Sequence, residues 1–340
     1  MFDKKSSCIE DLANELWLEV FEYVDWINLF TSFYGINERI NQLIQSIKSL
    51  SLYSSYLVER SNSTYILFQE FPIEKFKQIQ HFRLEYDDPY DGSFNIVKHL
   101  PSVSILVSLT ISGHWDNRTC VNPPTMNFFR LNCPFLQRLY LQGTLFNGEL
   151  PLVNNLCTFY FPSLLYIEVG VLHYVLAIRI LEQCPQLRSL SAKLYVYPND
   201  DGAKVSSALS STRINMGLPN MKKLNLRGDQ DFYNPFLTKF LELLLRCCPN
   251  LHTFSFEFTW YQNDRSLLDP YWWTTMLGSH NKLKQISLQL NVYGVLKALS
   301  KDVVNKFELL PFFSQLNVNV TYTIERTEFP HMTHNYCIKN

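Results

Sequence analysis

The stretch Cys248-Pro249-Asn250-Leu251-His252-Thr253-Phe254-Ser255-Phe256 carries the pattern that decides the fold. Its apolar residues Leu251, Phe254 and Phe256 have the spacing L-x-x-L-x-L, where L stands for any large apolar residue. The triple recurs with middle residues at positions 82, 109, 139, 167, 190, 224, 254, 286 and 316. By subtraction the steps are 27, 30, 28, 23, 34, 30, 32 and 30 residues. A period in this range predicts a solenoid, in which each unit buries its apolar face against its neighbours.

Each unit is expected to contain one strand and one returning helix. The last two residues of the triple are two positions apart, so they lie on one face of a strand. Apolar residues at helical spacing precede Pro249 in the segment 234–247, which predicts an amphipathic helix there. Pro249 bars the helix from continuing. The sequence therefore predicts an α/β solenoid with a parallel sheet on the inside and helices on the outside.

From about residue 78 to 319 the chain resembles a series of leucine-rich repeats. The motif Cys-Pro-x-Leu-x-x-Leu, which leads into the strand, begins at Cys133, Cys184 and Cys248. Variants with Leu or Phe before the proline begin at Leu100, Phe161 and Leu218. This form resembles the repeats found in F-box proteins. The resemblance implies the same solenoid that the spacing predicts.

The first 48 residues show a different, purely helical pattern. Apolar residues recur at helical spacing from Leu12 to Val24, then through a segment that Gly35 ends, and again from Ile40 to Ile47. This pattern predicts three short helices. The apolar residues are more numerous than one internal face requires, and an exposed apolar surface on a small domain indicates protein docking.

The head resembles an F-box. The residues that fall in register with the family pattern are Leu12, Glu15, Leu16, Val20, Phe21, Tyr23, Val24, Asp25 and Leu29, while Ala13 stands where the family has proline. The resemblance implies that the chain is an F-box protein with leucine-rich repeats, the substrate receptor of an SCF-type ubiquitin ligase. The head would then bind the Skp-type adaptor and, through it, a cullin–RING ligase. The adaptor contacts implied are Leu12, Ala13, Glu15, Leu16, Val20, Phe21, Val24 and Leu29.

Two interpretations of the head remain open. It recruits the adaptor, or it is a helical cap that covers the open end of a leucine-rich-repeat scaffold with no ligase role. In either case we expect an F-box-like helical domain at 1–48, a solenoid at 49–322 and a C-terminal tail at 323–340. Leu50 and Leu52 lie 32 residues before Phe82 and Leu84 and suggest an irregular first repeat.

The concave face of the sheet is the expected substrate-binding surface. Residues between and just after the inward-facing positions point to this face, and they are mostly polar, uncharged or mixed in sign, which suits a protein partner. A solvated face that binds nothing is the alternative. The residues expected to contact a protein substrate are Arg83, Tyr140, Gln142, Glu168, Lys193, Asn225, Arg227, Glu257 and Gln289.

Two segments between repeats are further candidates for binding. The segment 260–273 is rich in Trp and Tyr, which are favoured at binding hot spots, although Trp272 and Trp273 could equally open a helix and pack inward. The second is the segment 195–202.

Composition narrows the function classes. The formal net charge of −1 gives no electrostatic reason to expect nucleic acid or an anionic membrane as a partner. No secretory signal or membrane span is recognisable, so we expect a cytoplasmic or nuclear protein with buried free thiols. No phosphate loop, nucleophile elbow or paired C-x-x-C motif occurs, and His331, His334 and Cys337 lack a fourth ligand. The sequence thus predicts no enzyme activity, no cofactor and no metal site.

Overall fold

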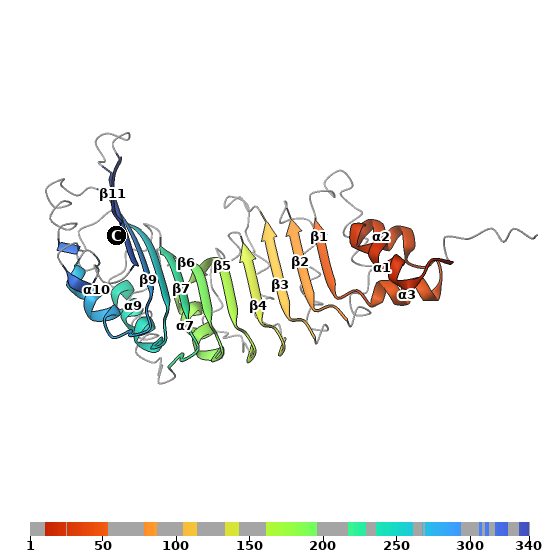
Figure 1. Ribbon diagram of the computed structural model, residues 1–340, viewed down its shortest axis with the longest axis horizontal. Helices are drawn as coiled ribbons and strands as arrows, with labels where there is room; N and C mark the ends of the chain where they lie inside the picture. Colours follow the sequence, from red (N-terminus) through yellow and green to blue (C-terminus); the bar gives the residue numbers. More distant parts are fainter. Residues whose placement is uncertain are drawn as a thin grey trace, which may run out of the picture.

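In the computed structural model, a three-helix head is followed by one long sheet (Figure 1). The structure describes residues 11–24, 26–53, 78–86, 105–113, 133–142, 161–195, 217–228, 236–260, 267, 269–293, 306–307, 310–312, 317–325 and 333–339. The head contains α1 (Asn14–Tyr23), α2 (Trp26–Phe33) and α3 (Glu38–Gln45). These three helices lie where the sequence predicts them.

The described residues form one sheet of eleven strands in chain order, each hydrogen-bonded to the next. Their bounds are β1 (Ser49–Tyr53), β2 (His81–Tyr86), β3 (Ser108–Gly113), β4 (Arg138–Gln142), β5 (Tyr166–His173), β6 (Ser189–Tyr195), β7 (Lys223–Gly228), β8 (Thr253–Trp260), β9 (Gln285–Tyr293), β10 (Asn317–Glu325) and β11 (Thr333–Lys339). All neighbours from β1 to β10 are parallel. The described part of the chain is therefore an α/β solenoid with a parallel sheet, and the pairing of β1 with β2 makes Leu50 and Leu52 part of its first repeat.

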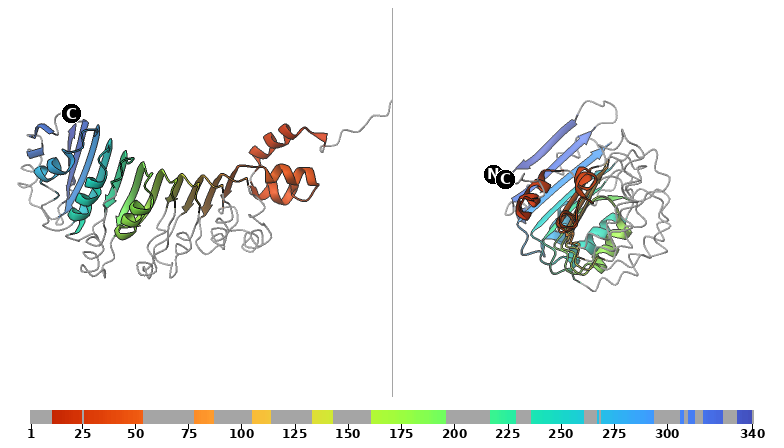
Figure 2. Two further views of the ribbon diagram at one scale, coloured as in Figure 1. Left: turned by 90° about the horizontal axis from the view of Figure 1, so that it is seen from below. Right: turned by 90° about the vertical axis from the view of Figure 1, so that its right-hand side faces the viewer.

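The described helices of the solenoid lie on one side of the sheet. They are α7 (Tyr174–Gln183), α9 (Phe236–Cys247) and α10 (Pro270–Leu277). Figure 2 shows α7 and α9 beneath the sheet, which curves from the head toward the C-terminus. The arrangement of sheet and helices agrees with the prediction, and Asp269 and Pro270 illustrate its local cause. The Asp269 carboxylate caps α10 by accepting a hydrogen bond from the backbone N–H of Tyr271 at 3.0 Å, and Pro270 occupies the first turn.

The apolar triples form a continuous wall across the sheet. The middle residues are in register from strand to strand, as Phe82, Leu109, Leu139, Ile167, Leu190, Leu224, Phe254 and Ile286, and all are buried. Burying one such side chain stabilises the fold by about 1.5–3 kcal/mol. Because every residue of the wall packs between two neighbouring repeats, the stability of each repeat depends on its neighbours.

The turn that leads into a strand, which we name the landing turn, repeats one backbone hydrogen bond in six of the described repeats. In each of them the fourth residue of the turn donates its backbone N–H to the carbonyl oxygen of the first residue, at 3.0–3.2 Å. The acceptors are Cys133, Phe161, Cys184, Leu218, Cys248 and His280. His280 thus takes the place of the landing cysteine, and its Nε2 lies 3.0 Å from the carbonyl oxygen of Leu245. This buried histidine joins two repeats and was not predicted.

Three details of the sheet differ from the sequence-based register. Val318 pairs with Ile286, so Val318 and not Leu316 is the middle residue of the last triple. A bulge at Gly170 makes Val171 the neighbour of Lys193. Residues 333–339, expected within a tail, form β11 antiparallel to β10, and β10 itself runs to Glu325, beyond the expected boundary at 322.

Gly228 provides a test of the packing between repeats. It pairs with Phe258, and a Cβ atom on Gly228 would lie 2.3 Å from Cδ2 of the Phe258 ring. Gly228→Ala should therefore destabilise the protein by about 1–3 kcal/mol, because the buried ring must move. Gly217→Ala is the control, since its Cβ would approach nothing closer than 3.9 Å. Urea denaturation followed by circular dichroism measures both, and equal midpoints would contradict the proposed clash.

Candidate interaction surfaces

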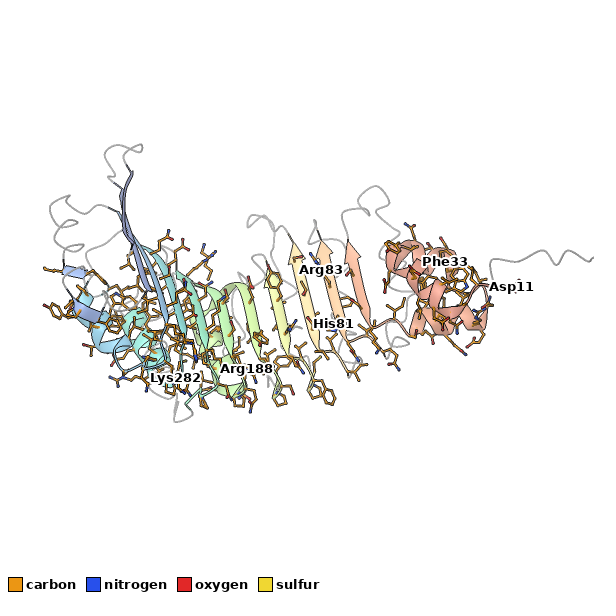
Figure 3. The ribbon with its side chains drawn as sticks, viewed as in Figure 1. Asp11, Phe33, His81, Arg83, Arg188 and Lys282 are labelled. Carbon is orange, nitrogen blue, oxygen red and sulfur yellow. The ribbon has the colours of Figure 1, made fainter. Side chains whose placement is uncertain are left out.

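The head folds around an aromatic cluster. The ring centroids of Trp17 and Phe21 in α1 lie 5.4 Å apart, and that of Phe33 in α2 lies 5.6 Å from Trp17 and 5.8 Å from Phe21. Ile40 and Ile44 of α3 complete this core and are fully buried. Figure 3 labels Phe33 within the head. The buried face of α1 is therefore the Trp17–Phe21 face.

Polar contacts fix α3 against the start of α1. The Arg39 guanidinium donates to the Asn14 side-chain oxygen at 2.7 Å and also to the carbonyl oxygen of Leu12. Asn37 caps α3, because its side-chain oxygen accepts a hydrogen bond from the backbone N–H of Ile40 at 2.8 Å. Gly35, with φ of 92°, makes the turn between α2 and α3. These contacts hold α1 in one orientation, with its other face toward solvent.

The outward face of α1 carries an apolar row that we name the head row: Leu16, Val20 and Tyr23. These residues are 47%, 39% and 85% exposed, and their i, i+4, i+7 spacing aligns them on one face. Glu15, Glu19 and Glu22 have the same spacing one position earlier and are all exposed. The apolar row is thus bordered by an acidic row.

The structure divides the predicted adaptor contacts into three groups. Ala13, Glu15, Leu16 and Val20 are exposed, and Leu12 and Val24 are half-buried against the core. Phe21 and Leu29 are 5% and 1% exposed, so they belong to the core of the head and not to its surface. The contact prediction for these two is corrected, because periodicity alone does not tell which face of α1 is internal. Tyr23 was missing from the predicted set although it is the most exposed residue of the row.

The concave face of the sheet, which we also call its open face, carries Arg83, Tyr140 and Glu168 in its N-terminal half. The register places Tyr140 beside Glu168, and Arg83 lies two strands away from Tyr140 in the same row. Desolvation and the negative charge of Glu168 raise the pKa of the Tyr140 hydroxyl, while the positive charge of Arg83 opposes this shift. This part of the face therefore presents a neutral phenol between two opposite charges.

In the C-terminal half the predicted residues pair with one another. Arg227 forms an exposed ion pair with Glu257, with 3.3 Å between Nε and Oε2. The Asn225 amide donates to the Ser191 hydroxyl at 3.1 Å. Lys193 is in register with Arg227, and Gln289 with Glu257, so all four share one row. The structure describes the backbone of Gln142 in β4 but not its side chain.

The aromatic segment before α10 is partly internal. Trp273 is fully buried, and its indole N–H donates to the carbonyl oxygen of Leu267 at 2.8 Å. Trp272 packs edge-on against Trp273, so the inward alternative holds for this pair. Tyr271 is 64% exposed. Residues 261–266 and 196–202 lie outside the described residues.

Four cysteines, Cys133, Cys184, Cys247 and Cys248, are buried free thiols. Burial raises the pKa of Cys133 to about 11 and that of Cys184 to about 12, and it also raises the pKa values of Cys247 and Cys248. Since the thiolate is the reactive form, these groups are packing residues and not nucleophiles. Within the described ranges, no helix is both long and apolar enough to cross a membrane, and no three potential ligands gather around a possible metal position.

No protein-family model and no curated protein matches the sequence. Among solved structures, one similar chain is the crystal structure of the leucine-rich repeat-containing protein LegL7 from Legionella pneumophila. It is 13% identical, the match covers 88% of each chain, and the TM-score is 0.34. This likeness carries no information on function.

The raised pKa values predict slow thiol chemistry. At about pH 9 an ordinary exposed thiol is largely ionised, whereas Cys133 and Cys184 remain protonated and shielded in the folded protein. Iodoacetamide should therefore label both cysteines only after unfolding in urea. Peptide mass spectrometry of the native and unfolded protein measures the labelling, and rapid labelling in the native state would contradict the buried landing position.

Proposed function

We propose that the chain is the substrate-recognition subunit of a cullin–RING ubiquitin ligase. Its head would dock on a Skp-type adaptor, and its repeats would hold a protein substrate. The single observation that carries this proposal is the head row, an exposed apolar face on α1 of a head that resembles an F-box in sequence.

The head row has the properties of a docking surface. Leu16 and Val20 are large aliphatic residues that the head leaves in water, although its core already buries Trp17 and Phe21. Removing one such side chain from water on docking contributes about 1.5–3 kcal/mol. The hydrogen bonds of Arg39 hold α1 in place. Docking of a partner therefore costs little conformational entropy in this helix.

The repeats supply the second half of the function. Their open sheet face is broad, polar and of mixed charge, and the register keeps its side chains in fixed rows. Such a surface suits a protein partner. A receptor of this kind acts by proximity, because holding a substrate beside a charged enzyme raises the effective concentration of its lysines. No residue of the chain itself would take part in bond formation.

One observation favours the alternative, a leucine-rich-repeat scaffold with a helical cap. Helix α2 contacts β1, the first strand of the sheet, and the buried Leu29 lies in this helix. A cap must cover the open end of a solenoid in this way. The contact is also compatible with adaptor binding, since it uses α2 and leaves the head row of α1 free.

A charge in the head row should abolish docking. Leu16→Asp is expected to weaken binding to a purified Skp-type adaptor by roughly a hundredfold, because it puts a carboxylate into the apolar contact. Leu18→Asp is the matched control: Leu18 is 37% exposed on the same helix, but two residues on, where it faces away from the row. Isothermal titration calorimetry measures both.

The outcomes separate the candidates. Equal loss in the two variants would show that the row is not the contact. Failure of the wild-type protein to bind any Skp-type adaptor would sink the ligase proposal.

Deletion of residues 1–47 tests the cap. If the head only recruits, the remaining repeats should stay soluble with an unchanged unfolding midpoint. If it caps the solenoid, the exposed end of β1 should make the repeats aggregate. Size-exclusion chromatography with thermal unfolding distinguishes the two results.

A further inference from the structure

A row of cations lies along the edge of the sheet where strands β6 to β9 begin. We name Arg188, Lys222, Lys223, Lys282 and Lys284 the basic rim. All five side chains are exposed. Figure 3 shows Arg188 and Lys282 along the lower edge of the sheet, at the amino-terminal ends of the strands.

Backbone hydrogen bonds fix the spacing of this rim. The N–H of Lys222 donates to the carbonyl oxygen of Arg188 at 2.8 Å, His252 donates to Lys222 at 2.8 Å, and Lys284 donates to His252 at 2.9 Å. Arg188, Lys222, His252 and Lys284 therefore occupy the same position in four successive repeats. With neighbouring strands about 4.8 Å apart, the row spans about 14 Å.

The segments that carry the rim contain no carboxylate. Residues 184–191, 218–227, 248–256 and 280–290 include no Asp or Glu. The ammonium group of Lys282 donates to a neutral group, the side-chain oxygen of Asn250, at 2.7 Å. The positive charge of the rim is thus not cancelled within these segments.

The fold does not require these charges. In the repeats of β2 to β5 the equivalent positions hold Gln80, Val107, Gln137 and Leu165, and the same backbone hydrogen bonds form at 2.8–2.9 Å. Like charges on adjacent strands repel one another, which destabilises the array slightly. An anionic partner would remove this repulsion.

We propose that the basic rim binds an acidic segment of a protein partner in extended conformation. An extended chain rises about 3.4 Å per residue, so about five residues match the row. Glu257 does not neutralise the rim, because it lies five residues along β8 from His252, about 16 Å away, and pairs there with Arg227. The formal net charge of −1 gives the whole chain no long-range attraction for a nucleic acid, so a short acidic segment that contacts the rim alone is the partner that fits. The inference deepens the proposed function by naming a substrate class, and it rests on the repeats being the receptor.

The test is a fluorescence anisotropy titration of the full chain, without adaptor, with a labelled hexaglutamate peptide. Binding should weaken as NaCl is raised, because exposed charges are screened. Lys222→Glu with Lys284→Glu should weaken it at least tenfold. Lys239→Glu with Lys306→Glu is the matched control, since it changes the net charge equally at exposed residues away from the rim, and should change affinity less than about twofold.

Each outcome decides the proposal. No binding of hexaglutamate, or equal weakening in the two double variants, would overturn it. Tighter binding of a twelve-nucleotide single-stranded RNA than of the peptide would overturn it in favour of nucleic acid. The double variant Lys222→Gln with Lys284→Gln removes the two charges without reversing them. Its circular dichroism spectrum shows whether a loss of peptide binding reflects unfolding. Since no adaptor is present, failure here is distinct from failure of the head to dock.

Discussion

The structure depends on the coupling of each repeat to its two neighbours. A single strand such as β7 buries Leu224 and Leu226 only because β6 and β8 present Leu190, Ala192, Phe254 and Phe256 in register. The backbone hydrogen bonds of the parallel pairs and the apolar wall thus reinforce one another. The isolated repeat has no core, so the free energy of folding resides in the interfaces between repeats.

This coupling leaves the rest of each repeat free to vary. The inward positions must be apolar, and the landing turn must form its backbone hydrogen bond. The fold places no such constraint on residues of the open face and the rim. The position that holds Gln80 and Val107 in early repeats holds Lys222 and Lys284 in later ones with unchanged hydrogen bonds. Surface residues that bind a partner can therefore change without a change of fold.

The sequence predicted the features that depend on hydrophobic periodicity, and it missed those that periodicity does not determine. The triples located nine strands and their parallel order, since a period-two pattern fixes which side chains face inward. The shift from Leu316 to Val318 escaped it, because a slip of two residues keeps the same face inward. The bulge at Gly170 and the strand β11 depend on pairing between segments and leave no local signal. In the head, the spacing marked α1 as amphipathic but did not distinguish the buried Phe21 from the exposed Leu16.

The two proposed surfaces lie at separate places on the array, and this separation has a physical consequence. The head adjoins β1, whereas the basic rim begins at β6, five strand spacings or about 24 Å along the sheet (Figure 1). Sites this far apart with no shared residues act additively. A partner held at the rim would therefore not compete with a partner on α1, and the intervening strands would set a fixed distance between them. A solenoid suits a receptor for this reason, since the effective concentration of two bound groups depends on the separation between their sites.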